Sequence, residues 1–79
     1  MINRTEKQLD ALQGDAMLIS MSARQNAILG LKENGFDTEH PDNAELILTN
    51  WIDSIISSLA FEDHSAELIK TFADIGITA

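Results

Sequence analysis

Two histidines stand beside carboxylates in this sequence, and these are the side chains best suited to hold a metal ion. His40 lies in the acidic segment 37–42, and His64 lies in the acidic segment 62–67. The first segment lacks the turn glycine and the distal glutamate of a calcium-binding loop. The second offers a single histidine–carboxylate pair at helical spacing, whereas a structural zinc site needs four ligands. The sequence therefore predicts no metal site.

Other catalytic groups are missing or lack the surroundings that they need. The chain has no cysteine, its serines stand outside any Gly-x-Ser-x-Gly turn, and it has no glycine-rich phosphate loop. Neighbouring carboxylates occur without any pattern that indicates the partly desolvated cleft in which an acid–base pair works. We expect neither an enzyme nor a bound cofactor.

The 79 residues carry a net charge of −8, and all of it lies in the second half of the chain. Residues 1–35 hold four basic and four acidic side chains, whereas residues 36–79 hold nine acidic side chains and Lys70. Residues 42–59 follow a helix and a glycine turn, as a recognition helix would, but contain neither lysine nor arginine. This distribution argues against direct binding of nucleic acid.

The acidic half has two interpretations. It is either a solvated surface that keeps a small protein in solution or a negative field that attracts a basic protein. The second interpretation predicts a partner-binding acidic face, with Trp51 or Phe61 as its aromatic anchor. The residues assigned to this face are Asp37, Glu39, Asp42, Glu45, Glu62, Asp63 and Glu67.

Apolar residues spaced three and four apart predict an all-α fold, a small bundle of three to four helices in one domain over residues 1–79. The first helix is expected over residues 5–34, from a capping box at Thr5 to a left-handed Gly35 that brings Phe36 against Leu31. Unbroken, it would be about 45 Å long and would protrude from a globule roughly 30 Å across. A break at Gly14-Asp15, with the aspartate as N-cap, is therefore favoured over one continuous helix.

Two further helices are expected over residues 42–60 and 64–75. Asp42 is the predicted cap of the first, again as part of a capping box. The second should end at Gly76, where Phe72 and Ile77 repeat the contact expected at the end of the first long helix.

One apolar stripe follows the first helical segment, and small residues on it allow a neighbouring helix to approach closely. That neighbour is either another part of the chain or a second subunit. Residues 16–31 are apolar on more than one face, yet a chain this short has little interior and no disulfide to support it. We therefore predict a homodimer. The stripe assigned to the core or the dimer contact is Leu12, Ala16, Ile19, Ala23, Ala27 and Leu31.

The stretch Thr38-Glu39-His40-Pro41, followed after three residues by Glu45-Leu46-Ile47, resembles the Thr-Glu-His-Pro…Asp-Leu-Ile stretch of the colicin nuclease immunity proteins. That family consists of small acidic four-helix inhibitors. The resemblance is confined to residues 38–47. This sequence departs from the family at two points. The family's toxin-binding tyrosine pair is absent, because Leu48 and Thr49 stand at those positions, and the helix expected here is longer than the family's very short third helix. We therefore base no functional assignment on this stretch.

Two main functions, and a weaker third one, follow from these features. The first is a non-enzymatic inhibitor or regulator that binds a basic protein, with nucleic-acid-binding proteins among the candidates, and it is similar in general character to small acidic proteins of phages and mobile elements. The alternative is a structural or assembly module whose apolar stripes do the binding. A weaker third option is a sensor of a small ligand between helices. With no signal-peptide pattern and no run of 18 apolar residues, we expect a cytoplasmic protein without membrane contact.

Overall fold

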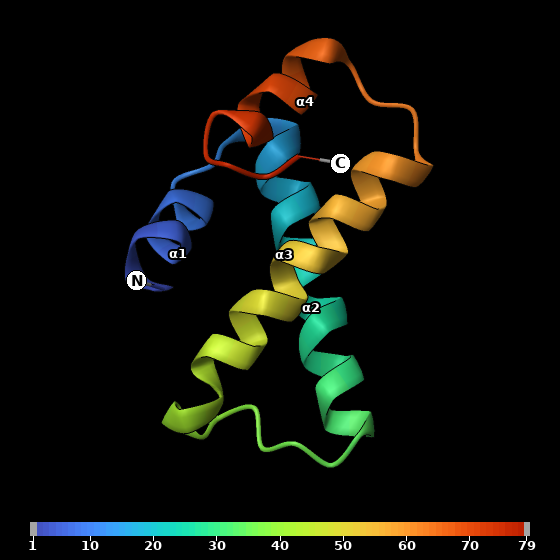
Figure 1. The fold of residues 1–79 in the computed structure, drawn as a ribbon. Helices are drawn as coiled ribbons and strands as arrows, with labels where there is room; N and C mark the ends of the chain where they lie inside the picture. The colour runs from blue at the N-terminus through green and yellow to red at the C-terminus, as the bar shows by residue number, and fades with distance from the viewer. Residues whose placement is uncertain (1, 79) are drawn as a thin grey trace.

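Helices make up most of the computed structural model, which describes the backbone of residues 2–78 and the side chains of residues 5–78. This part of the chain contains no β-strand, so the all-α prediction is confirmed (Figure 1). The elements are α1 (Ile2–Asp10), α2 (Gly14–Glu33), a 3-10 turn η1 (Pro41–Asn43), α3 (Ala44–Phe61) and α4 (Ala66–Ala73).

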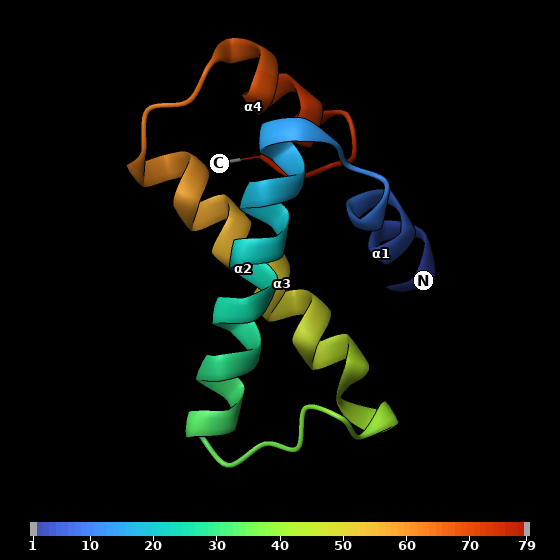
Figure 2. The same ribbon diagram turned by 180° about the vertical axis from the view of Figure 1, so that it is seen from behind.

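An antiparallel pair, α2 and α3, forms the scaffold of the molecule (Figures 1 and 2). The loop 34–43 joins the two helices at one end of the pair, and α4 packs against α2 at the other end. Helix α1 contacts both α2 and α3 from the side. The molecule measures 36 × 25 × 19 Å, so it is elongated along this pair.

The expected break near Gly14 is present, but its local structure differs from the prediction. Helix α1 ends at Asp10, and Gly14 starts α2 with a φ of +60°, which favours glycine. The N-cap is Gln13 in an extended conformation, not Asp15, and no side chain caps the helix. The capping box at Thr5 is also wrong. Helix α1 begins at Ile2, so Thr5 lies inside it and lacks the extended backbone of a cap.

Both predicted glycine endings are confirmed by their hydrogen bonds. At the end of α2, the N–H of Phe36 donates to the oxygen of Leu31 and that of Gly35 to Lys32, each at 3.0 Å. The end of α4 repeats the pattern, because the N–H of Ile77 donates to the oxygen of Phe72 at 2.9 Å. Glycines 35 and 76 have φ values of +86° and +87°. These are Schellman motifs, in which glycine adopts the left-handed conformation without a Cβ clash.

The capping box predicted at Asp42 is wrong, because Pro41 starts a helical turn one residue earlier. Proline fixes φ near the helical value and suits the first position of a helix. The cap is therefore His40, whose Nδ1 accepts a hydrogen bond from the N–H of Asp42 at 3.1 Å. The η1 turn then leads directly into α3, which begins at Ala44. The start of α4 agrees with expectation, since Ser65 caps it by accepting from the N–H of Leu68 at 3.2 Å.

The core lies between α2 and α3, and α1, α4 and the C-terminal Ile77 add to it. The apolar stripe of α2 packs within the chain, because small side chains let α3 approach. The half-buried Ile19 packs at its edge, and Ser20 is a buried position that the apolar pattern missed. The buried apolar residues of the core are Leu9, Leu12, Ala16, Ala23, Ala27, Leu31, Leu48, Trp51, Ile55, Leu59, Phe72 and Ile77.

Trp51 is the main polar tie between the two long helices. Its indole Nε1 donates a hydrogen bond to the backbone oxygen of Ser20 at 2.8 Å, and the contact is buried. The guanidinium of Arg24 lies over the ring, with Cζ 5.7 Å from its centre. The small Ser20 side chain leaves space for the indole to reach the helix backbone, so this position requires a small residue.

Replacing Trp51 by phenylalanine should lower the free energy of unfolding by about 1–3 kcal/mol, because the hydrogen bond is lost and the smaller ring leaves a void. Urea unfolding followed by circular dichroism measures this change. Met21→Ala, at an exposed position of α2 that lies outside the groove between α2 and α3, is the control and should change stability by less than about 0.5 kcal/mol. Equal losses in the two variants would contradict the assignment of Trp51 as the tie.

Gly35 and Gly30 form a matched pair for testing backbone strain. A Cβ added at either position would meet no atom within 4 Å, so the two sites differ in their backbone, and of the two only Gly35 has a positive φ. We expect Gly35→Ala to lower the free energy of unfolding by about 1 kcal/mol or more, owing to strain. Gly30→Ala inside α2 should raise it by about 0.5–1 kcal/mol. Thermal unfolding of both variants tests this, and changes of the same sign would show that α2 does not end as described.

Candidate functional site

The first group of candidate residues lies at the loop end of the α2–α3 pair. We call Asp37, Glu39, Asp42 and Glu45 the loop acids, and all four are exposed. Hydrogen bonds hold their loop in shape. Oδ1 of Asp37 accepts from the N–H of Glu39 at 3.0 Å, and the amide of Asn43 donates to the backbone oxygen of Asp37 at 2.8 Å. Nδ1 of His40 lies 3.7 Å from a carboxylate oxygen of Asp42.

The second group lies at the turn between α3 and α4. We call Glu62, Asp63 and Glu67 the turn acids, and these are also exposed. The carboxylate of Glu62 accepts a hydrogen bond from the hydroxyl of Ser58 at 3.4 Å. The same carboxylate lies 3.6 Å from Nε2 of His64.

The acids predicted to form one face occupy two separate ends of the molecule, which corrects that prediction (Figures 1 and 2). Glu45 lies in the first turn of α3, and Glu62 directly follows its last residue. At 1.5 Å per residue, α3 separates them by about 25 Å along its axis. This exceeds the Debye length of about 8 Å at physiological salt, so the two groups act independently on a partner.

Neither group of acids forms an ion pair with a lysine or arginine. Over residues 5–78, the ion pairs within 4.0 Å are those of His40 with Asp42 and of His64 with Glu62. The basic side chain of Arg24 does come near the loop acids, since it lines the same hollow as Glu39. Both ends of the molecule present a negative field.

The two candidate aromatic anchors differ in exposure. Trp51 is 3% exposed and is held in the core by Ser20 and Arg24, so it is not available to a partner. Phe61 ends α3 and is 88% exposed, beside Glu62. Of the two, Phe61 is the side chain that a partner can reach.

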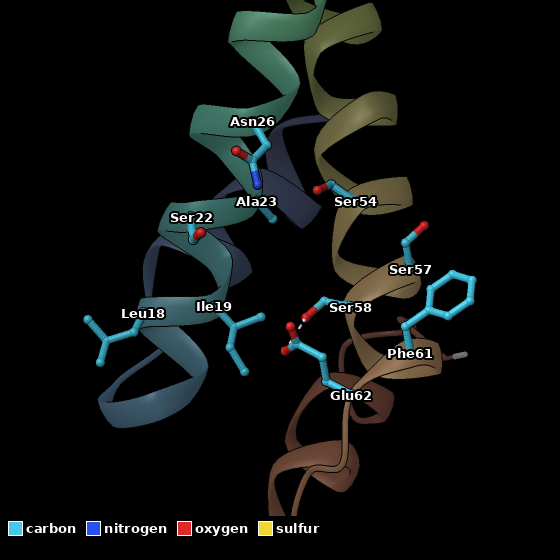
Figure 3. A pocket seen from close by; sticks show the side chains of 10 residues that line it. All are labelled: Leu18, Ile19, Ser22, Ala23, Asn26, Ser54, Ser57, Ser58, Phe61 and Glu62. Carbon is cyan, nitrogen blue, oxygen red and sulfur yellow. Dashed lines mark hydrogen bonds between the residues drawn. The ribbon is translucent and has the colours of Figure 1, made fainter.

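An open groove between α2 and α3 is a feature that the sequence pattern did not predict. Its volume is about 490 Å³, and a further hollow of about 330 Å³, which shares Asn26, Ser54 and Ser57 with it, continues the groove toward Gly30. Leu18 and Phe61 stand outward on its opposite sides, with polar side chains between them (Figure 3). The lining residues are Leu18, Ile19, Ser22, Ala23, Asn26, Ser54, Ser57, Ser58, Phe61 and Glu62.

The sequence did carry a signal for this groove. Serine and asparagine side chains follow the buried stripes of both α2 and α3, at positions that the helical pattern assigns to solvent. Side chains this short cannot fill the space between two crossing helices, so a groove remains. Finding it required the pairing of α2 with α3, which the helical spacing does not give.

The groove lining holds no histidine, lysine or arginine, and its single carboxylate belongs to Glu62. Across the described residues, no three histidine, aspartate or glutamate side chains gather closely enough to hold a metal ion. None of the helices in this part of the chain is both long and apolar enough to span a membrane.

Comparison of the chain with models of protein families, with characterised proteins and with solved structures gave no match. The short resemblance of residues 38–47 to the colicin nuclease immunity proteins therefore gains no support. The 18 residues of α3 also differ from the very short third helix of that family.

His64 is the one described side chain with a buried nitrogen that lacks a hydrogen bond. The side chain is 12% exposed, and the Glu62 carboxylate, 3.6 Å from its Nε2, is too far away to form a hydrogen bond with it. A buried polar atom without a partner destabilises a fold by about 1–3 kcal/mol.

His64→Leu should therefore raise the free energy of unfolding by about 1 kcal/mol. The matched variant His40→Leu should lower it by about 0.5–1 kcal/mol, because that exposed histidine caps the η1 turn. Chemical unfolding of both variants at neutral pH measures the two changes. A loss of stability in His64→Leu would mean that the histidine makes a favourable polar interaction.

Proposed function

We propose that this chain is a non-enzymatic regulator or inhibitor that binds a basic region of another protein through its loop acids. The observation that carries the proposal is the set of exposed carboxylates that form no ion pair within 4.0 Å with a lysine or arginine of the described chain. Such a field speeds the encounter with a positive surface and opposes binding to nucleic acid. A surface that normally binds phosphates fits this chemistry, because carboxylates can occupy the same positive sites.

The loop acids are favoured over the turn acids because their loop is held in one shape. Asp37, His40 and Asn43 form hydrogen bonds across it, and Pro41 restricts its backbone. A loop that is ordered before binding loses less conformational entropy when a partner docks. An inhibitor built in this way blocks the partner's surface and performs no chemistry on it.

The test is affinity capture from a cell lysate at about 50 and about 500 mM salt, followed by titration of the purified partner. The Debye length falls from roughly 14 to roughly 4 Å over this range, so the affinity should fall at least about tenfold. Replacing the four loop acids by their amides should abolish binding. The shape of the loop should be kept, because the side-chain oxygen in Asp37→Asn can still accept the hydrogen bond from the N–H of residue 39. The same change in the turn acids is the control and should leave most of the affinity. Binding that is unaffected by salt and by both sets of changes would contradict the proposal.

A second candidate, an assembly module, is favoured by a different observation. Large apolar side chains stay exposed on α2 and at the end of α3, among them Leu18, Leu29 and Phe61. Assembly through these side chains does not require the acids, so the two functions are compatible within one chain. Which molecule covers the apolar side chains is a separate question.

A further inference from the structure

Two exposed apolar side chains, one on α2 and one on α3, line the groove between these helices. Leu18 lines the groove on the α2 side and is 61% exposed, and Phe61 lines it on the α3 side. Leu29 is eleven residues after Leu18, which is close to three helical turns, so it continues the same edge of α2. An apolar rim therefore borders a groove with a polar but largely uncharged lining.

The total surface is larger than a compact monomer of this mass should expose. The accessible surface is 5468 Å², whereas a monomer of 8.7 kDa is expected to expose about 4,700 Å². The excess, roughly 700 Å², is spread over an elongated molecule of 36 × 25 × 19 Å, and a standard protein interface takes ~800 Å² from each partner. The radius of gyration of 12.4 Å also exceeds the ~11.6 Å expected for 79 residues.

The groove and the side chain that can fill it lie on the same face of the molecule. A two-fold dimer brings one patch of a chain against the identical patch of its partner, so each protrusion must meet a hollow of the same surface. Phe61 protrudes beside the groove, and the groove floor is made of small side chains such as Ala23 and Ser54 (Figure 3). A Cβ at Gly30, further along, meets no atom within 4 Å, so the groove stays open there.

Charge favours a second copy over a basic partner at this surface. The carboxylates that would attract a basic chain stand mainly at the two ends of the molecule. The groove itself holds Glu62, already bonded to Ser58, and Asp53 in the adjoining hollow. Glu62 is also one of the turn acids and directly follows Phe61, so this end of the groove is negative. Two chains that each carry a charge of −8 repel least when their contact is centred on the uncharged lining around Ala23 and Ser54.

We propose that this chain forms a two-fold homodimer in which Phe61 of each copy inserts into the α2–α3 groove of the other. The contact overlaps only in part with the dimer stripe expected from sequence: Ile19 and Ala23 line the groove, whereas Ala16 is buried within the chain and lines neither hollow. Leu18 and Leu29 flank the inserted ring. The proposal goes beyond the binding of a basic protein and does not depend on it, since the loop acids stay outside the contact.

Sedimentation velocity from about 1 to about 100 µM, a range that brackets a micromolar Kd, tests the proposal with the full chain. We expect the mass to reach twice 8.7 kDa and to stop there. Phe61→Ala should raise the dimer Kd by about 30-fold or more, as for a central aromatic contact. Ser57→Trp, at an exposed position of the groove, should do the same by filling it.

Phe36→Ala is the matched control, since this phenylalanine is also exposed but stands at the far end of α2. It should leave the dimer Kd within about twofold, which lies inside the usual effect of a surface change. Circular dichroism shows whether each variant is folded. A folded monomer at the highest concentration overturns the proposal. So does a dimer that neither Phe61→Ala nor Ser57→Trp weakens, and so does a mass that grows beyond two chains.

Discussion

The close approach of α3 to α2 is the constraint on which the rest of the structure depends. It is possible because the inner face of α2 carries alanines and Ser20, over which the Trp51 indole reaches the helix backbone. A tryptophan in a core needs a partner for its N–H, and here the partner is a carbonyl on the opposite helix. The hydrogen bond joins residues 31 apart in the sequence and fixes the two helices in register. Helices α1 and α4 then cover what this pair leaves open.

Small side chains at the helix contact also explain the outer surface. A contact made of alanine and serine buries little apolar area per residue, so a chain of 79 residues forms a thin core. The larger residues of α2, such as Leu18 and Leu29, then fall outside the contact with α3. The groove beside them has the same origin, because serine and asparagine cannot fill the space where the helices diverge. The packing that stabilises one chain therefore leaves an apolar surface for another.

Local features were predictable from sequence, and features that need the pairing of elements were not. The endings at Gly35 and Gly76 depend on one glycine and one apolar pair within a few residues, and both are confirmed. The caps at Thr5 and Asp42 were wrong because the neighbouring residues continue the helical turn, Pro41 most directly. The division of the acids into two ends depends on the 18 residues of α3 that separate them. The distance between the two groups of acids follows from the sequence only once α3 is known to be one continuous helix.

The separation of the loop acids from the groove reconciles the two functions that the sequence left as alternatives. If the loop acids lined the groove, a second copy would meet strong repulsion there, because bringing like charges together out of water is costly. If the exposed leucines lay among the loop acids, a basic partner and a second copy would compete for one site. In this fold the loop acids stand at one end of the α2–α3 pair, whereas the groove, with Leu18 and Phe61, lies toward the other end, beside Glu62. A dimer formed through the groove would carry the loop acids twice. A partner with two basic sites would then be bound with an effective concentration set by the rigid spacing of the helices, which raises affinity without any new contact.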